Sequence, residues 1–159
     1  MRLDKWAVTA QEALQAALGI AGDVEASEVA PTHLLKALLD SNERNLRSIL
    51  EKIGADPDAI ATQVDQVISK APKVSGAQIG IGNDILKVIN EAEKLATKLG
   101  DSYVTSEHLL TALANDNTDA GRILRDAGVT AKRVEEVYNE LRGDERVTSQ
   151  DAKPQFEAL

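Results

Sequence analysis

The stretch VAPTHLLKALL at residues 29–39 recurs as VTSEHLLTALA at residues 104–114. Each copy holds one of the two histidines of the chain, His33 and His108, so the copies align 75 residues apart. An Ile-Leu pair, a glycine and two further apolar positions then recur 74 residues apart, after one residue is deleted from the second copy. These aligned positions are Ile49, Leu50, Gly54, Ile60 and Val64 in the first copy and Ile123, Leu124, Gly128, Val134 and Tyr138 in the second. The chain is a tandem repeat, and this dictates its architecture.

Composition narrows the fold class and the kinds of partner. Of the 159 residues, 43% are hydrophobic but only 3% are aromatic, which suits close packing of helices better than a β-sandwich. The net charge of −8 argues against nucleic-acid binding through clustered Lys and Arg. The chain has no cysteine, so disulfide and thiolate chemistry are excluded. No apolar run is long enough to span a membrane and no apolar leader opens the chain, so we expect a cytoplasmic protein that does not act at a membrane.

Helix boundaries are marked by proline, glycine and capping residues. Pro31 suits the first position of a helix, Gly54 suits the residue after a helix end, and Asp56-Pro57 suits a helix start. Thr9 and Glu12 have the spacing of a capping box. The eight predicted helices run from residue 10 toward 18, over 33–39, near 45–53, from Asp56-Pro57 toward 68, and over 83–99, 105–114, 119–127 and 130–142.

The helices fall into two groups of four. Repeat one covers about residues 6–68 and repeat two about residues 83–142, and the segment SKAPKVSGAQIGIG at 69–82 links them. A four-helix unit of this size is marginal alone, so we expect an all-α domain over residues 1–143 whose repeats pack about a pseudo-twofold axis. Residues 144–159 are polar and weakly periodic, and we interpret them as an exit linker or a docking tail rather than core.

No pattern in the chain predicts catalysis. The glycine cluster from Gly76 to Gly82 has no Lys-Ser/Thr pair after it, and HExxH, GxSxG and paired-cysteine patterns are missing from the sequence. We therefore predict no catalytic, cofactor-binding or metal-binding residues. His33 and His108 each stand at the start of a short helix, where an imidazole can pack and hydrogen-bond to the neighbouring loop, so we interpret both as structural.

The loop GDSYVTSEH, which contains Asp101 and Glu107, allows two interpretations. Asp101 follows a helix-ending glycine and is by default a turn residue, while Glu107 in the first helical turn complements the helix dipole. Alternatively, the two carboxylates form an acidic rim that receives basic groups from a partner.

Apolar residues around the linker and the fifth helix suggest a surface for peptide. Ile79, Ile81 and Ile85 flank a glycine-rich linker, where they are either tucked into the body or exposed as a sticky surface. Leu95 and Leu99 continue a helical stripe whose edge could line a groove for an extended apolar peptide. We predict client contacts at Leu95, Leu99, Asp101, Val104, Glu107, Ile79 and Ile81.

The doubled motif, a short hydrophobic-x-[PST]-x-H-L-L-x-A-L segment followed by I-L and glycine, resembles the Clp N-terminal repeat of the AAA+ chaperones. The resemblance covers residues 1 to about 143, and the segments MRLDKW and LRGDERVTSQDA at the two ends are similar to the ClpB branch, the disaggregases. It implies an eight-helix globule that engages unfolded or aggregated polypeptide and passes it to a hexameric ring. ATP and magnesium would be bound by other domains of such a protein, with a possible co-chaperone acting alongside.

The resemblance leaves an alternative open. ClpC- or ClpA-like domains dock folded adaptor proteins, and ClpC-type domains carry a glutamate before the histidine in both repeats, where it receives phosphorylated arginine. Here the second copy has Glu107, but the first has Thr32, which counts against a symmetric site. We therefore expect a client-binding domain that is monomeric in isolation and is not itself an enzyme, with adaptor docking as the second hypothesis.

Overall fold

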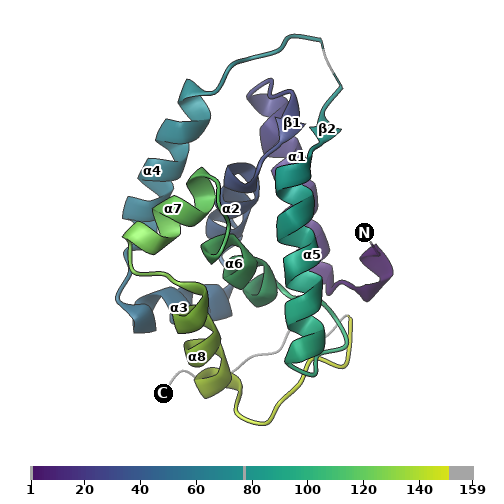
Figure 1. Cartoon of the computed structure of the whole chain (residues 1–159), viewed down its shortest axis with the longest axis vertical. Coiled ribbons are helices and arrows are strands. Elements are labelled where there is room, and N and C mark those ends of the chain that lie inside the picture. The colour runs from purple at the N-terminus through teal and green to yellow at the C-terminus, as the bar shows by residue number, and fades with distance from the viewer. Residues whose placement is uncertain (1, 77, 151–159) are drawn as a thin grey trace.

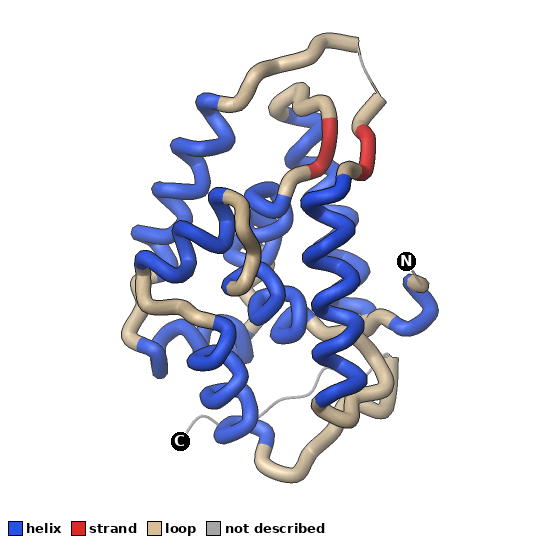
Figure 2. The backbone as a smooth tube through the Cα atoms, viewed as in Figure 1, coloured by secondary structure: helices blue, strands red, loops and turns tan. Residues whose placement is uncertain are grey.

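The computed structural model of the chain describes residues 2–76 and 78–150. Within these residues it contains eight α-helices, a short 3-10 turn and two very short strands (Figures 1 and 2). The elements are η1 (Leu3–Lys5), α1 (Val8–Asp23), β1 (Glu28–Val29), α2 (Pro31–Asp40), α3 (Arg44–Ile53), α4 (Pro57–Lys70), β2 (Gly80–Ile81), α5 (Asn83–Lys98), α6 (Ser106–Ala114), α7 (Asp119–Asp126) and α8 (Ala131–Arg142). The predicted all-α class with four helices per repeat is confirmed.

Most helix ends follow the local chemistry of the sequence. The Asp56 side chain accepts a hydrogen bond from the backbone N–H of Asp58 at 3.0 Å and so caps α4. Gly54 and Gly128 follow α3 and α7 with φ of +89° and +85°, a conformation that costs glycine little. The capping box predicted at Thr9 is wrong, because α1 already begins at Val8 and no side chain caps its first turn.

The two repeats pack about a pseudo-twofold axis. Under exchange of α1–α4 with α5–α8, most helix contacts have a counterpart: α1 on α2 corresponds to α5 on α6, and α2 on α4 to α6 on α8, whereas the packing of α7 on α6 has no equal between α3 and α2. Between the repeats, α3 packs on α8 and α4 packs on α7. Because each repeat closes its apolar face against the other, both contribute to one hydrophobic cluster, in which Leu34 and Leu109 are both fully buried.

The segment between the repeats is more ordered than a plain linker. Gly80–Ile81 pairs in parallel with Glu28–Val29, and the two strands lie side by side in Figure 2. The backbone N–H of Val74 also donates to the carbonyl of Glu25 at 2.7 Å. The short strand pair was not predicted, since a two-residue strand has no periodicity in the sequence.

Part of the segment at 144–150, which was predicted to lie outside the core, packs on the body of the domain. The prediction is wrong for Val147, which is buried. Its carbonyl accepts from the N–H of Ser102 at 2.8 Å. Further on, the Gln150 side chain donates to the carbonyl of Trp6 at 2.9 Å, and the Val8 N–H donates to the Gln150 carbonyl at 3.1 Å. The rest of the predicted exit linker, 151–159, lies outside the described residues.

Candidate functional site

The two repeated histidines act as helix caps. In α6, the backbone N–H of Thr105 donates to Nδ1 of His108 at 2.8 Å. In α2, the N–H of Ala30 donates in the same way to Nδ1 of His33 at 2.9 Å. Each imidazole thus takes the place of the Glu or Gln that completes a capping box three residues into a helix. The structural interpretation of both histidines agrees with these contacts, and the signal in the sequence was their spacing of three from the N-cap residue.

His108 also belongs to a buried polar network around Asp101. Because a backbone N–H can only donate, Nδ1 of His108 is an acceptor, and the ring proton lies on Nε2. Nε2 therefore donates to Oδ2 of Asp101 at 2.8 Å, and Nη1 of Arg142 donates to the same oxygen at 2.6 Å. The other oxygen, Oδ1, accepts from the N–H of Val147 at 2.8 Å. The side chains of Asp101 and Arg142 are both 0% exposed, so this is a buried ion pair.

The charges of this network are stabilised by each other. Burial acts to raise the pKa of Asp101, but the hydrogen bonds from His108 and Arg142 outweigh it, and the pKa lies below its ordinary value. Burial likewise acts to lower the pKa of Arg142, yet the bond to Asp101 raises it overall. Arg142 also donates to the Tyr138 hydroxyl at 2.9 Å and to the carbonyl of Leu99 at 2.9 Å. The network joins α6, α8, the loop after α5 and residues 144–150, and its contacts are structural.

The predicted client-contact residues do not share one surface. Asp101 and Val104 are buried, and both line a hollow of about 390 Å³ beside Arg2 and Lys5. Glu107 is 6% exposed. Their contact with a client stays a prediction, but the Asp101 carboxylate already has three donors within the fold and does not form an open acidic rim.

The predicted apolar residues are spread along α5. Leu95 is buried and Leu99 is partly buried near the end of the helix. Ile79 and Ile81 precede its first turn, and sixteen helical residues separate these two ends by ~24 Å. Ile79 packs against the core, whereas Ile81 is 48% exposed. Ile85 is fully buried, as the burial interpretation predicted.

Glu107 lies near a second carboxylate, that of Glu43, which precedes α3 of the other repeat. Burial raises the pKa of Glu43, the nearby Glu107 charge raises it further, and the hydroxyl of Ser41 acts in the opposite direction. Glu43 also accepts from the hydroxyl of Ser41 at 3.3 Å. The like charges of Glu43 and Glu107 therefore repel each other across the junction of the two repeats.

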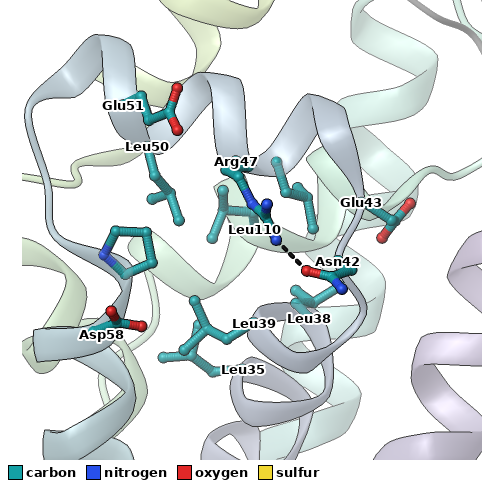
Figure 3. Close-up of a pocket in the computed structure, with 12 residues that line it drawn as sticks. Leu35, Leu38, Leu39, Asn42, Glu43, Arg47, Leu50, Glu51, Asp58 and Leu110 are labelled. Carbon is teal, nitrogen blue, oxygen red and sulfur yellow. Dashed lines mark hydrogen bonds between the residues drawn. The ribbon is translucent and has the colours of Figure 1, made fainter.

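A second hollow lies between α2 and α3. Here a groove of about 370 Å³ has leucine side chains on its floor and walls (Figure 3). Arg47 on α3 donates to the Asn42 side chain at its edge. The apolar residues that line it are Leu35, Leu38, Leu39, Leu46, Leu50, Pro57 and Leu110, and the polar ones are Asn42, Glu43, Arg47, Glu51 and Asp58. Most of these leucines are buried, and Leu39 and Pro57 are the partly exposed apolar residues that a peptide could reach here.

The groove is open because α3 stands apart from α2, whereas their counterparts in repeat two pack together. There, Nη1 of Arg125 on α7 donates to the carbonyls of Ala114 at 3.0 Å and Asp116 at 2.7 Å, at the end of α6. Gly121 permits this approach, since a Cβ at that position would lie 1.9 Å from the Asp116 oxygen. α7 is thereby clamped onto the end of α6.

Repeat one lacks both parts of the clamp. At the 74-residue spacing, Gly121 corresponds to Arg47, and Arg125 corresponds to Glu51. The side chain of Glu51 has no N–H group that could donate to the carbonyls at the end of α2. The side chain of Arg47 fills the space that Gly121 leaves free in repeat two. Sequence reasoning missed the groove, although aligning the two repeats at these positions would have revealed the difference.

The described part of the chain has neither a membrane-spanning helix nor a cluster of metal ligands. No helix there has both the length and the apolar character needed to cross a bilayer. No group of three or more His, Asp or Glu side chains converges in residues 2–76 and 78–150 as metal ligands do.

Comparison with known proteins identifies the family. The family model of the Clp repeat N-terminal domain matches residues 5–156. This chain belongs to that family. Chaperone protein ClpB of Porphyromonas gingivalis is 35% identical over 159 residues, and the Clp repeat domain described here spans 18% of the length of that relative. The chain is therefore similar to the N-terminal part of a much longer chaperone.

Solved structures share the same fold. The Hsp104 N-terminal domain of Candida albicans superimposes with a TM-score of 0.81 at 23% identity, covering 92% of this Clp repeat domain and 97% of that chain. A complex of the ClpV N-domain with a VipB peptide superimposes with a TM-score of 0.68 at 18% identity, covering 86% of each chain. At these identities the likeness establishes the fold alone.

Proposed function

We propose that this Clp repeat domain captures exposed apolar segments of unfolded or aggregated polypeptide for the ATP-driven remainder of a ClpB-type chaperone. The observation that carries the proposal is the groove between α2 and α3, where Leu39 and Pro57 are partly exposed above buried leucines, whereas in repeat two Arg125 holds α7 against the end of α6. Apolar side chains of an unfolded segment gain about 25 cal/mol per Å² when such a surface removes them from water.

The likeness to ClpB and ClpV supports this proposal by analogy. The curated relative is named as a chaperone, and a ClpV N-domain of the same fold has been solved with a bound peptide. A shallow groove binds a single segment weakly. Display of several copies on one ring would raise the overall avidity by about 10²–10⁴ without any new contact.

The adaptor-docking alternative draws less support from the geometry. It depended on an acidic surface at Glu107, and that residue is 6% exposed and packed at the junction of the repeats. A folded adaptor would need a broader accessible acidic patch at this position than the buried side chain offers.

The test is a titration of the isolated domain with a permanently unfolded protein, such as reduced and carboxymethylated α-lactalbumin, followed by backbone amide NMR. Folded α-lactalbumin and an unrelated acidic helical protein serve as controls. We expect weak, saturable shift changes with the unfolded protein only. Equal responses to the unfolded protein and to the controls would refute client capture.

A further inference from the structure

Residues 147–150 form a strap that covers part of the domain. The strap follows α8 and lies beside the end of α5 (Figure 1). The N–H of Val147 donates to Oδ1 of Asp101 at 2.8 Å, and the carbonyl of Val147 accepts from the N–H of Ser102 at 2.8 Å. At the other end of the strap, the carbonyl of Gln150 accepts from the N–H of Val8 at 3.1 Å. Backbone groups of the strap thus make most of its contacts.

The place that the strap occupies does not require the sequence of the strap. One apolar side chain is buried there, that of Val147, which is 3% exposed. Thr148 and Ser149 are exposed, and residues 145–149 belong to neither a helix nor a strand. Another non-helical segment with one small apolar side chain can offer the same N–H and carbonyl groups, as in peptide recognition by strand addition.

The surface beneath the strap is held together by contacts of its own. The N–H of Ala7 donates to the carbonyl of Val104 at 2.8 Å, and the N–H of Val104 donates to the carbonyl of Lys5 at 2.9 Å. Oδ2 of Asp101 accepts from Arg142 at 2.6 Å. None of these bonds involves the strap, so the donors and acceptor that receive it stay in place when the strap leaves.

We propose that the strap is an autoinhibitory segment, which covers a site where the domain takes up a segment of unfolded polypeptide. Opening of the strap frees Oδ1 of Asp101 as an acceptor and the N–H groups of Ser102 and Val8 as donors. A segment held by a few hydrogen bonds and one buried side chain opens locally at low cost in free energy. The inference rests on the proposed function and adds a covered site to the exposed groove between α2 and α3.

The strap and the client compete for this site. A tethered segment acts at an effective concentration of roughly 1 mM, so weak contacts are enough to keep the site covered in most molecules. The apparent affinity for a client is then reduced in proportion to the fraction of molecules in which the strap is open. Weakening of the strap should therefore strengthen client binding at this site.

The first experiment compares binding of reduced and carboxymethylated α-lactalbumin to wild type and variants of the 159-residue chain. Val147→Asp places a charge at the buried position and should open the strap, so that the client binds about fivefold more tightly. Thr148→Asp adds the same charge at the neighbouring exposed position and should bind as wild type does. Gln150→Ala removes a bond to the carbonyl of Trp6 without changing a buried position, and should strengthen binding by a smaller factor. Circular dichroism and Trp6 fluorescence show whether each variant is folded.

The second experiment supplies the strap as a separate peptide. The peptide DERVTSQ, with the sequence of residues 144–150, is titrated into the Val147→Asp variant and followed by amide NMR. It should shift the amide signals of Val8 and Ser102, with a Kd on the order of 1 mM, and should compete with the unfolded client. The same peptide carrying Val147→Asp should not bind. Wild type should bind neither peptide at these concentrations, because its own strap fills the site.

Several results would overturn the inference. These are client binding by Val147→Asp and Gln150→Ala no tighter than by wild type, no shift at Val8 and Ser102 with the strap peptide, and a gain in Thr148→Asp equal to that in Val147→Asp. If wild type bound the unfolded client and Val147→Asp bound it no better, client capture would stand and the strap would be structural only. If neither wild type nor any variant bound the client, the proposed function and this inference would both fail.

Discussion

Replacement of Asp101 by asparagine tests whether the buried network holds the domain together. The substitution keeps the size of the side chain but removes the charge that faces Arg142, at a position with 0% side-chain exposure. Breaking a buried ion pair from one side typically costs about 3–5 kcal/mol, because the other charge is left buried. An asparagine oxygen can still accept one of the three hydrogen bonds, which returns about 1 kcal/mol. We therefore expect Asp101→Asn to lower the free energy of unfolding by about 2–4 kcal/mol.

Urea unfolding measures this loss, followed by circular dichroism and by the fluorescence of Trp6, the one tryptophan of the chain, which is fully buried. For a chain of this length, the same loss corresponds to a decrease in Tm of roughly 5–15 °C. Asp65→Asn is the matched control. It removes the same charge from an exposed pair with Lys36, whose atoms are 2.7 Å apart, and should cost only about 0.2–1 kcal/mol.

The pH dependence of the free energy of unfolding provides an independent test of this role of Asp101. The pKa of Asp101 is lowered in the folded state, so its contribution to stability is present above the ordinary aspartate value and is lost as the pH falls below about 4. The difference in unfolding free energy between wild type and Asp101→Asn should therefore shrink in acid. Amide exchange at Val147 should also become faster in the variant, because its N–H bonds to the Asp101 carboxylate. A loss no greater than that of Asp65→Asn would refute the assigned role of the network.

Further substitutions test other parts of the fold. Gly121→Ala should destabilise the domain by more than about 1 kcal/mol, because its Cβ would overlap the carbonyl oxygen of Asp116, which lies 1.9 Å away. Gly19→Ala, in the open middle of α1, should instead stabilise the domain by roughly 0.5–1 kcal/mol. Urea unfolding measures both changes, and equal effects of the two substitutions would contradict this prediction. Glu43→Gln should stabilise the domain at neutral pH, because burial raises the pKa of Glu43 and the wild type loses stability as pH rises from the ordinary glutamate value through the raised one. Unfolding curves at several pH values should show the advantage of the variant disappearing in acid, and an advantage that grew in acid would reverse the sign. His33→Ala should lower the free energy of unfolding by about 0.5–2 kcal/mol, because the N–H of Ala30 loses its acceptor. His33→Gln should recover part of this loss, since a glutamine at the same position can complete a capping box. Equal Tm values for the two variants would argue against a capping role of His33.

The helices were predictable because their signals are local. Pro31, Gly54, Asp56 and Gly128 act through backbone geometry and a single capping bond, so their positions in the sequence suffice to mark the ends. The start of α1 shows the limit of such signals. Thr9 and Glu12 have the spacing of a capping box, but the helix begins two residues earlier, at Val8, after Ala7, whose N–H donates to the carbonyl of Val104 at 2.8 Å. A tertiary contact there outweighs a local preference.

The candidate site was less predictable, since it depends on which elements meet. Asp101 and Arg142 are 41 residues apart, and only the fold brings Oδ2 and Nη1 to 2.6 Å. Sequence reasoning treated Asp101 as exposed or as part of a turn because an isolated aspartate is usually at the surface. It also predicted a groove along the edge of the apolar stripe of α5; Leu95 on that stripe is buried, and the groove stays a prediction.

The sequence alone determined the doubling, the eight helices and the structural character of the histidines, because repeats, caps and helical periodicity are written in neighbouring residues. The tertiary structure decided which repeat is open. The two copies have the same pattern of apolar residues, and both could have closed in the same way. A glycine and an arginine at 121 and 125 clamp α7 in place, whereas Arg47 and Glu51 leave α3 apart from α2. The difference lies in side-chain volume and hydrogen-bond donors, which act only when the two helices meet.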